Sequence, residues 1–532
     1  MIVCSACPFN CKFGPFCYIL ISKNVKKGSL ILNTDSDTSL QPAGPLSQAA
    51  AVRAQRAVSL VKKIGSSIRK EVEGTPKIDR SRSLEEGKAL RKTVRRREMG
   101  VWEVSHDRKG SIDLIFEQEK TRLPDLIPVR HERMSASAFA FYRAAAVIMT
   151  RDLAQSAVTG IRVQACGDAH ISNFGIFASP ERRLVFDIND FDETLPGPWE
   201  WDIKRLCTSV EICGRDRGFS PEQREQAVRA AAQSYCRSMH TYSEMGTLDV
   251  WYDHMDLEKM FADTSAETPA DISTSLMRKT MEKAIQKNRS RALDRLTEQV
   301  DGHTRIISNP PLIVPFRELS NPEEAGIDVG KASEFLGLAL RQYRLSLPKE
   351  RRYLIDQYTV CDAARKVVGV GSVGTRAWII VLEGDGRHDP LILQVKEAGP
   401  SVLEPYAGKS EYLEHGRRVI EGQRVIQTAG DILTGWVRIP DFKGQVMDYY
   451  VRQLWDSKGS LDLEKVSQEE LIGYAALCAQ TLAHAHAKTG DRHAIAAYLG
   501  KGNAFADAMT AFAGAYADQN QIDYEMFLNA IN

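Results

Sequence analysis

Carboxylates at the ends of two short apolar stretches restrict the possible folds of this chain more than any other feature. Residues 162–192 are predicted to form strand, loop and strand, with a turn at Ser179 to Arg182 between the apolar stretches. The loop contains the segment Cys166 to Gly175, and the acidic segment Phe186 to Glu193 follows the turn. Because an acid at the end of a buried strand costs free energy unless a cation lies beside it, the pattern predicts a metal ion there.

The spacing of these polar residues is typical of one kind of chemistry. Asp168 and Asn173 lie five residues apart, and Asp187 and Asp190 follow after one hairpin. Kinase-type phosphoryl transfer uses an Asp that orients the attacking hydroxyl, an Asn five residues on and an Asp that holds Mg²⁺. Two other interpretations stay open for this segment: a metal hydrolase that uses His170 with the acids, and a purely structural turn.

A glycine-rich motif lies about 200 residues later in the chain. Gly369, Gly371 and Gly374 form a G-x-G-x-x-G, and an apolar strand is predicted directly after it at 377–382. A dinucleotide fingerprint opens a helix, whereas strand–turn–strand is the arrangement of a kinase Gly-rich loop that covers phosphates. One strand later stands Lys396, where a lysine contacts the α- and β-phosphates and pairs with a helix glutamate. The candidates on a helix expected over 410–429 are Glu411, Glu414 and Glu421. Glu421 is counted among the cofactor-binding residues, and which glutamate pairs with Lys396 stays open.

The order of the two motifs determines the expected fold class. In an ordinary kinase-like chain the Gly-rich loop and its lysine precede the catalytic loop, whereas here Asp168 comes first. A helix expected from Ser467 through His486 is similar to the one that normally leads into the catalytic loop. We therefore expect an α+β, kinase-like, two-lobed fold that is circularly permuted, with the catalytic-lobe motifs before the Gly-rich nucleotide lobe.

Helix-start signals and turn chemistry mark further elements. Ser220 and Ser467 are each followed three residues later by Gln or Glu, the capping-box pattern that opens a helix. Another helical pattern runs from about 275 to 300.

The expected domain organisation follows from local composition. Residues 1–50 hold four of the ten cysteines and then a run rich in Ser, Thr, Pro and Gly, which predicts a disordered start. A metal site at Cys4, Cys7, Cys11 and Cys17 is the alternative, although their spacing fits neither zinc nor iron–sulfur patterns well. The other expected parts are a basic helical arm at 51–120, a catalytic-loop and helical lobe at 121–356, a Gly-rich nucleotide-binding lobe at 357–456 and C-terminal helices on the catalytic lobe at 457–532.

Charge and hydropathy narrow the class of partner. The 70 Lys and Arg against 69 Asp and Glu give a net charge of +1, which argues against a general polyanion binder. Residues 51–100 carry 15 Lys and Arg against 6 Asp and Glu, so nucleic acid is expected at most on this arm. With no apolar run of membrane-spanning length and no secretory signal pattern, we expect a cytoplasmic protein without membrane contact.

These motifs resemble those of a bacterial family catalogued as domain of unknown function 2252. The resemblance covers about residues 80–530 and brings no established reaction. It rests on the segments Arg122 to Arg130, Arg133-Met134, Phe141 to Arg143, Gly167 to His170, Asn173 to Gly175, Asn189 to Glu193, Trp199 to Arg205, Gly422 to Arg424, Tyr450 to Asp456 and His484 to Asp491.

The segment from Gly167 to Asn173 is also similar to the catalytic loop of aminoglycoside phosphotransferases and choline kinases. Those proteins carry Gly-Asp-x-His-x-x-x-Asn, which matches Gly167, Asp168, His170 and Asn173. The resemblance implies that Asp168 orients the substrate hydroxyl, that Asn173 holds metal and that His170 supports the loop. Cys166 stands where those proteins commonly have His, which puts loop rigidity in doubt.

The resemblance implies two further roles. The metal-binding Asp corresponds to Asp187 by hairpin length or to Asp190 by the following Phe191, and both alternatives stay open. The later helix Asp, which braces the catalytic loop, corresponds to Asp202.

The expected function is ATP- and Mg²⁺-dependent phosphoryl transfer to an unknown hydroxyl acceptor, with a small molecule preferred. The expected partners are therefore a nucleotide and that acceptor. Three alternatives remain: a nucleotide-binding pseudokinase or binding module, an AMP transferase on the same fold, and a metal-dependent hydrolase unrelated to kinases.

Overall fold

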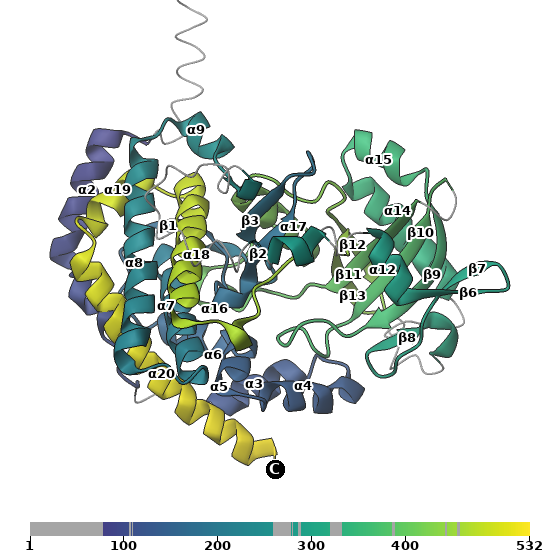
Figure 1. The fold of residues 1–532 in the computed structure, drawn as a ribbon, viewed down its shortest axis with the longest axis horizontal. Coiled ribbons are helices and arrows are strands. Elements are labelled where there is room, and N and C mark those ends of the chain that lie inside the picture. The colour runs from purple at the N-terminus through teal and green to yellow at the C-terminus, as the bar shows by residue number, and fades with distance from the viewer. Residues whose placement is uncertain are drawn as a thin grey trace, which may run out of the picture. The chain divides into compact units, whose positions relative to one another are not determined.

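A computed structural model of the chain describes residues 78–531, apart from gaps at 106–107, 109, 259–277, 279, 286–288, 320–331, 386–388, 442–443 and 455–457. The part from Asp79 onward forms one compact unit that mixes helices with antiparallel sheets (Figure 1). The Cys-containing segment at 1–50 and the basic residues at 51–77 lie outside the described residues. Within the described ranges, no helix combines the length and the apolar character that crossing a membrane requires.

Helices form one side of this unit, on the left of Figure 1. Helix α7 lies inside it and packs against α8, α18 and α20, while α2 packs on α19. The longer helices are α2 (Arg80–Thr93), α7 (Trp199–Asp216), α8 (Pro221–Glu244), α18 (Gln468–Thr489), α19 (Arg492–Leu499) and α20 (Asn503–Ile531). The shorter ones are α3 (Ser111–Glu119), α4 (Ile127–Met134), α5 (Ala138–Ala144), α6 (Ala146–Leu153), α9 (Thr247–Tyr252) and α16 (Glu404–Ala407), with short 3₁₀ turns η1 (Arg96–Gly100), η2 (Pro124–Leu126), η3 (Ile171–Asn173), η4 (Phe316–Glu318) and η6 (Leu463–Lys465).

A six-stranded antiparallel sheet forms the other side, with strand order β12-β13-β11-β10-β9-β8 (Figure 1). Its strands are β8 (Ile313–Pro315), β9 (Thr359–Lys366), β10 (Ala377–Glu383), β11 (Pro390–Glu397), β12 (Gly435–Pro440) and β13 (Val446–Gln453). One face of the sheet packs on α14 (Ala332–Ser346) and α15 (Lys349–Ile355). The other face packs, through Ile379 and Ile392, on α12 (Arg289–Leu296).

Small sheets connect the two sides and carry the loop at 166–173. Strand β1 enters this loop and pairs with β4, and the hairpin β2–β3 leaves it and pairs with β5. Helix α17 lies against β12 and β13. The bounds are β1 (Arg162–Ala165), β2 (Phe174–Ala178), β3 (Leu184–Ile188), β4 (Leu195–Pro198), β5 (Met255–Asp256) and α17 (His415–Ile426).

Local predictions from the sequence are confirmed at several points. The expected hairpin is β2–β3, and the Gly-rich segment lies in the turn between β9 and β10. The helices that begin after Ser220 and Ser467 both carry the predicted capping box, in which the Ser side chain and the third helical residue satisfy each other's backbone N–H groups.

The helix predicted over 275–300 is wrong at its C-terminal end. Residues 297–300 form strand β6 (Thr297–Val300), which pairs with β7 (His303–Ile306). Asp301 and Gly302 form the turn with φ values of 51° and 77°. Two consecutive positive φ values suit a tight hairpin turn and end a helix, and the Asp-Gly dipeptide is the sequence signal for such a turn.

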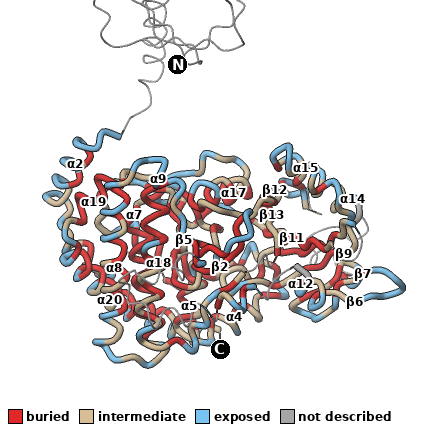
Figure 2. The backbone as a smooth tube through the Cα atoms, turned by 45° about the horizontal axis from the view of Figure 1, so that its top comes forward, coloured by how far each residue is buried: buried red, intermediate tan, exposed pale blue. Residues whose placement is uncertain are grey.

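The central helix α7 is buried from Trp199 to Gly214, and the burial map in Figure 2 shows the same concentration of buried backbone inside the helical side. Five of its buried residues are charged, namely Glu200, Asp202, Lys204, Arg205 and Glu211. Buried charges need partners. Two of the five, Asp202 and Arg205, find them in the loop at 166–173, so α7 fixes the position of that loop.

Candidate functional site

Asp202 of α7 fixes the loop at 166–173 through hydrogen bonds to its backbone. Its carboxylate accepts hydrogen bonds from the backbone N–H groups of Cys166 (2.6 Å) and Gly167 (2.9 Å). His486 of α18 lies 3.2 Å from the same carboxylate through Nε2. Gly167 has a φ of 83°, and an added Cβ would overlap the carbonyl oxygen of Glu193. The loop therefore depends on a glycine at 167 and a carboxylate at 202.

Asp168 follows directly and is paired with Arg205. The Nε group of Arg205 donates to Asp168 Oδ1 at 2.8 Å, and its guanidinium lies over the Tyr142 ring, 4.0 Å from the centroid. Burial raises the pKa of Asp168, while Arg205 and Arg143 oppose this rise. Burial alone would lower the pKa of Arg205, but the charge of Asp168 raises it. The pair therefore places a basic carboxylate beside a permanently charged guanidinium.

His170 and Asn173 complete the loop. The side-chain amide of Asn173 donates from Nδ2 to the backbone oxygen of Asp168 at 2.7 Å, so its other terminal atom, Oδ1, is the one suited to a cation. His170 is buried with its Nε2 3.8 Å from Asp168 Oδ2. Burial, reinforced by Arg143 and Arg205, lowers the pKa of His170 well below its usual value, so the ring is neutral near pH 7.

Lys396 of β11 reaches the acidic segment after β3. Its Nζ donates to Asp192 Oδ2 at 2.8 Å, and the Tyr450 hydroxyl donates to the other carboxylate oxygen at 2.5 Å. Burial would lower the pKa of Lys396, but Asp192, Tyr450 and Asp190 raise it. Burial would raise the pKa of Asp192, but Lys396 and Tyr450 hold it at about 2. Both groups are therefore charged at neutral pH.

The two metal candidates, Asp187 and Asp190, face different surroundings. Burial raises the pKa of Asp190, the charge of Asp192 adds to this rise, and Lys396 and Arg452 oppose it. Asp190 thus lies within the charge cluster around Lys396.

Asp187 lies away from that cluster. Its Oδ1 accepts from the backbone N–H of Ile188 at 2.8 Å, and burial raises its pKa to about 7 against the opposing charge of Lys488. In the strand register Asp187 is opposite Gly175. The hairpin therefore directs Asp187 towards α18 and Asp190 towards β11.

The Gly-rich loop lies over the same cluster. Gly369 and Gly374 have φ values of 37° and 89°, and an added Cβ on Gly371 would lie 3.5 Å from the carbonyl oxygen of Arg143. The Ser372 hydroxyl donates to Asp192 Oδ2 at 3.3 Å. Carbonyl groups of this loop accept hydrogen bonds from Arg122, Arg130 and Arg133. These hydrogen bonds attach the tip of the Gly-rich loop to the acidic segment after β3 and to α4.

The expected glutamate partner of Lys396 is not found on α17. Glu421 lies 3.5 Å from Arg424, one turn further along the same helix, while Lys396 pairs with Asp192 instead. What α17 contributes is Arg418, whose guanidinium donates to the backbone oxygens of Asp192 and Thr194, each at 2.7 Å. The helix therefore positions the acidic segment by its backbone, and this segment supplies the carboxylate for the lysine.

A comparison with protein families shows where the chain belongs. Residues 122–530 match the family described as "Uncharacterized protein conserved in bacteria (DUF2252)". The chain belongs to this family. No curated protein and no solved structure shows a significant match to the chain.

The family match contains every residue of this site, from Arg122 to His486. The residues to which sequence reasoning assigned no role include Arg143, Asp192, Arg205, Arg418 and Tyr450. Four of these five lie in segments that carry the family resemblance, so their position in those segments was the available signal. Arg418 had no such signal, because its role depends on how α17 crosses the backbone after β3.

The donor set at this site suits a hard cation held together with a ligand. Within the ranges that the structure describes, no three His, Cys, Asp or Glu side chains converge as a metal cluster. Asn173 and Asp190 supply oxygen atoms at adjoining strand ends, since the Asn189 N–H donates to the Asn173 carbonyl at 2.8 Å. Mg²⁺ is often bound by one or two protein oxygens together with substrate phosphates.

Proposed function

We propose that the protein is an ATP- and Mg²⁺-dependent phosphotransferase on a circularly permuted, kinase-like, two-lobed fold, with a small hydroxyl compound as acceptor. One observation carries the proposal. Lys396 follows Asp168 by more than 200 residues, yet it bonds Asp192, whose charge in turn acts on Asp168. A Gly-rich turn, a strand lysine, an Asp–Asn loop and a second acid thus converge, as phosphoryl transfer requires.

The end of α18 supports the permuted order. Thr489, at the end of this helix, accepts a hydrogen bond on Oγ1 from the backbone N–H of Gln164 in β1 at 3.1 Å. Helix α18 therefore ends beside the strand that enters the loop at 166–173. In an unpermuted chain these two elements would be directly connected, so a break at this point and a new link elsewhere account for the order of the motifs.

Each residue has a role that its surroundings support. Asp168, with its raised pKa, takes the proton from the acceptor hydroxyl as the hydroxyl oxygen bonds the γ-phosphorus of ATP and the bond from that phosphorus to the departing ADP breaks. Asn173 and Asp190 would hold Mg²⁺, which neutralises charge on the phosphates when it is bound. Lys396 stays protonated beside Asp192 and is available to the phosphates together with backbone N–H groups of the Gly-rich loop.

A second candidate is a binding module that holds nucleotide without transferring phosphate. It is favoured by the 2.8 Å pair between Arg205 and Asp168, because a guanidinium on the base lowers its readiness to accept a proton. AMP transfer is a further alternative, because it uses the same metal chemistry. ATP labelled at the γ-phosphate or at the α-phosphate distinguishes the two reactions. The γ-label reaches the acceptor in phosphate transfer, and the α-label reaches it in AMP transfer.

The deciding experiment compares Asp168→Asn with Asp187→Asn in purified protein. We expect Asp168→Asn to lose at least about 100-fold in transfer of γ-labelled phosphate to a pool of small hydroxyl compounds, while ATP·Mg²⁺ affinity stays within about threefold. Asp187→Asn, which keeps the fold of the hairpin, is expected to transfer phosphate like the parent protein. Undiminished transfer by Asp168→Asn would rule the assignment out, and ATP binding without transfer in the parent protein would favour the binding module.

A further inference from the structure

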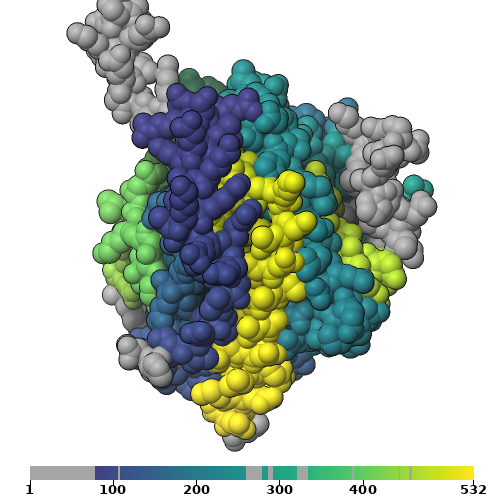
Figure 3. All heavy atoms as spheres, turned by 90° about the vertical axis from the view of Figure 1, so that its left-hand side faces the viewer, coloured from purple at the N-terminus to yellow at the C-terminus, as the bar shows by residue number. Residues whose placement is uncertain are grey.

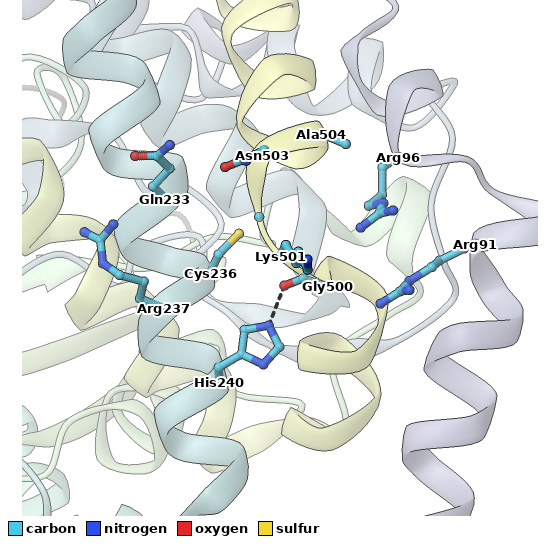
Figure 4. Close-up of a pocket in the computed structure, with 11 residues that line it drawn as sticks. Arg91, Arg96, Gln233, Cys236, Arg237, His240, Gly500, Lys501, Asn503 and Ala504 are labelled. Atoms are coloured by element: carbon cyan, nitrogen blue, oxygen red, sulfur yellow. Dashed lines mark hydrogen bonds between the residues drawn. The ribbon is translucent and has the colours of Figure 1, made fainter.

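A second concave site lies on the helical side, apart from the residues discussed above. It is a cavity of about 930 Å³ where three segments far apart in the sequence meet. Figure 3 shows these segments side by side, with α2 in purple, α8 in teal and α19 and α20 in yellow. Figure 4 shows the lining, with Arg91 and Arg96 on one side of Gly500 and Lys501 and the residues of α8 on the other. His240 of α8 bonds the Gly500 carbonyl, whereas the Arg237 guanidinium extends away from this loop.

The charge of this cavity is positive and unbalanced. Four residues that are cationic at neutral pH line it, namely Arg91, Arg96, Arg237 and Lys501, and no carboxylate is found among the described residues of the lining. In the described part of the chain, none of the four forms an ion pair with an acid. Burial lowers the pKa of Arg91, and the nearby charge of Arg96 lowers it further, as expected where like charges are held together. An anion would remove this repulsion.

Arg91 and Arg96 are held in place by hydrogen bonds within the protein, and each still has N–H groups available to a ligand. Arg91 donates to the carbonyl groups of Ala497 and Tyr498, and Arg96 donates to that of Leu499 at 2.8 Å. A guanidinium has five N–H donors, so each keeps several for a ligand. Because they also cap the C-terminal carbonyls of α19, they are presented rigidly.

The backbone opposite them is arranged for an anion as well. Gly500 and Gly502 have φ values of 62° and 85° and flank Lys501 directly before α20 begins. An added Cβ on Gly500 would lie 2.6 Å from Arg96 Nη1 and 2.8 Å from Arg91 Nη2, so a side chain at this position would displace both guanidinium groups. Helix α20 has 29 residues and no acid in its first turn, so its first N–H groups and the positive end of its dipole meet the cavity at Asn503.

We propose that this cavity binds a small organic phosphate with at least two phosphoryl groups, separately from the nucleotide site. Converging guanidinium groups and a helix N-terminus suit tetrahedral phosphoryl oxygens better than a single carboxylate. The volume lies in the range of small-molecule sites and exceeds that of one inorganic ion. The four cations of the lining are confined to this cavity, and the chain as a whole has a net charge of only +1. Both facts favour a compact ligand over an extended nucleic acid.

Inorganic pyrophosphate is the probe, with binding measured by calorimetric titration of the full chain. Lys501→Gln and Arg237→Gln remove exposed cations whose side chains form no hydrogen bond with any residue that the structure describes, so both variants should fold. We expect each to weaken pyrophosphate binding about tenfold, the loss of one charge-assisted hydrogen bond. Lys88→Gln, an exposed lysine on α2 outside the cavity, is the matched control and should bind like the parent protein.

A third variant separates the two sites. Lys396→Met changes the nucleotide site, and it should bind pyrophosphate at the cavity with unchanged affinity whether or not the proposed function is correct. Three results would each overturn the inference: no pyrophosphate binding by the parent protein, loss of binding in Lys396→Met but not in Lys501→Gln and Arg237→Gln, or equally strong binding of citrate. The inference would also be overturned if the protein bound a duplex oligonucleotide more tightly than pyrophosphate and Lys501→Gln and Arg237→Gln weakened that binding.

Discussion

The Nζ atom of Lys396 lies 2.8 Å from Oδ2 of Asp192, although the two residues are 204 positions apart in the sequence. Lys396 is 3% exposed, and the Tyr450 hydroxyl occupies the other oxygen of the same carboxylate. This pair joins the six-stranded sheet to the segment that follows β3. It is therefore a structural link between two halves of the chain, and under the proposed function it is also where a nucleotide phosphate would meet the lysine.

A double-mutant cycle on this pair should show strong coupling. Lys396→Met leaves the Asp192 carboxylate without its cation and with the hydroxyl groups of Tyr450 and Ser372 as donors. We therefore expect a loss of about 2–3 kcal/mol in the free energy of unfolding measured with urea. Combined with Asp192→Asn, the loss should be smaller than the sum of the two single losses by about 1–2 kcal/mol. Additive losses would show that the contact contributes little to stability.

The hydrogen bonds from the loop at 166–173 to Asp202 give a second prediction. Asp202→Ala leaves the backbone N–H groups of Cys166 and Gly167 buried without an acceptor, and we expect a loss of about 3 kcal/mol in the free energy of unfolding. The control is Asp507→Ala, which removes an exposed carboxylate paired with Arg229 at 2.6 Å. That change should cost less than about 1 kcal/mol. Equal effects of the two substitutions would mean that Asp202 does not support the loop.

Two glycines with the same backbone angle offer a matched test of the loop geometry. Gly160 and Gly167 both have a φ of 83°, but an added Cβ meets nothing within 4 Å at Gly160 and overlaps the Glu193 carbonyl at Gly167. Gly160→Ala should cost about 1 kcal/mol from the backbone angle alone. Gly167→Ala should cost about 2 kcal/mol more because the loop must shift. Urea unfolding of both variants measures the difference, and similar values would contradict the described packing.

The titration of Asp187 predicts a pH dependence of stability. Its pKa is about 7 in the folded protein, against about 4 in an unfolded chain, so the folded state binds the extra proton between these values. Stability from this group is therefore present at low pH and is lost as the pH rises from about 4 towards 7.

Asp187→Asn removes that dependence, since Asn resembles the protonated acid. Relative to the parent protein, the variant should gain about 1–3 kcal/mol in the free energy of unfolding between pH 5 and pH 7.5. Urea unfolding at the two pH values measures this gain. A parallel pH dependence in both proteins would show that Asp187 titrates with an ordinary pKa.

Local features of this protein could be predicted because their causes are local. The capping boxes at Ser220 and Ser467 need only residues three positions apart, and the turn at Gly369 to Gly374 follows from glycines between apolar strands. The helix expected up to residue 300 failed for a local reason too, because the Asp301-Gly302 turn signal outweighs helical periodicity.

The site was predictable in its residue types and less so in its partners. The sequence alone identified Asp168, Asn173, Lys396 and Asp202 as polar residues placed at strand and helix ends. It left Asp187 and Asp190 as equal alternatives, because hairpin length fits one and the following Phe191 fits the other. The direction of each carboxylate depends on the twist of β2–β3 against α18 and β11, which no spacing encodes.

The sequence by itself therefore determined which chemical groups this protein can present and which short elements carry them. Only the tertiary structure decided that Lys396 pairs with Asp192 rather than with Glu421, and that Arg418 holds the acidic segment by its backbone. The physical reason is the separation in sequence over which each interaction acts. Capping, turns and strand periodicity arise within a few residues, whereas the partner of a buried charge is set by the packing of α17, β11 and β13 against a segment about 200 residues away in the chain.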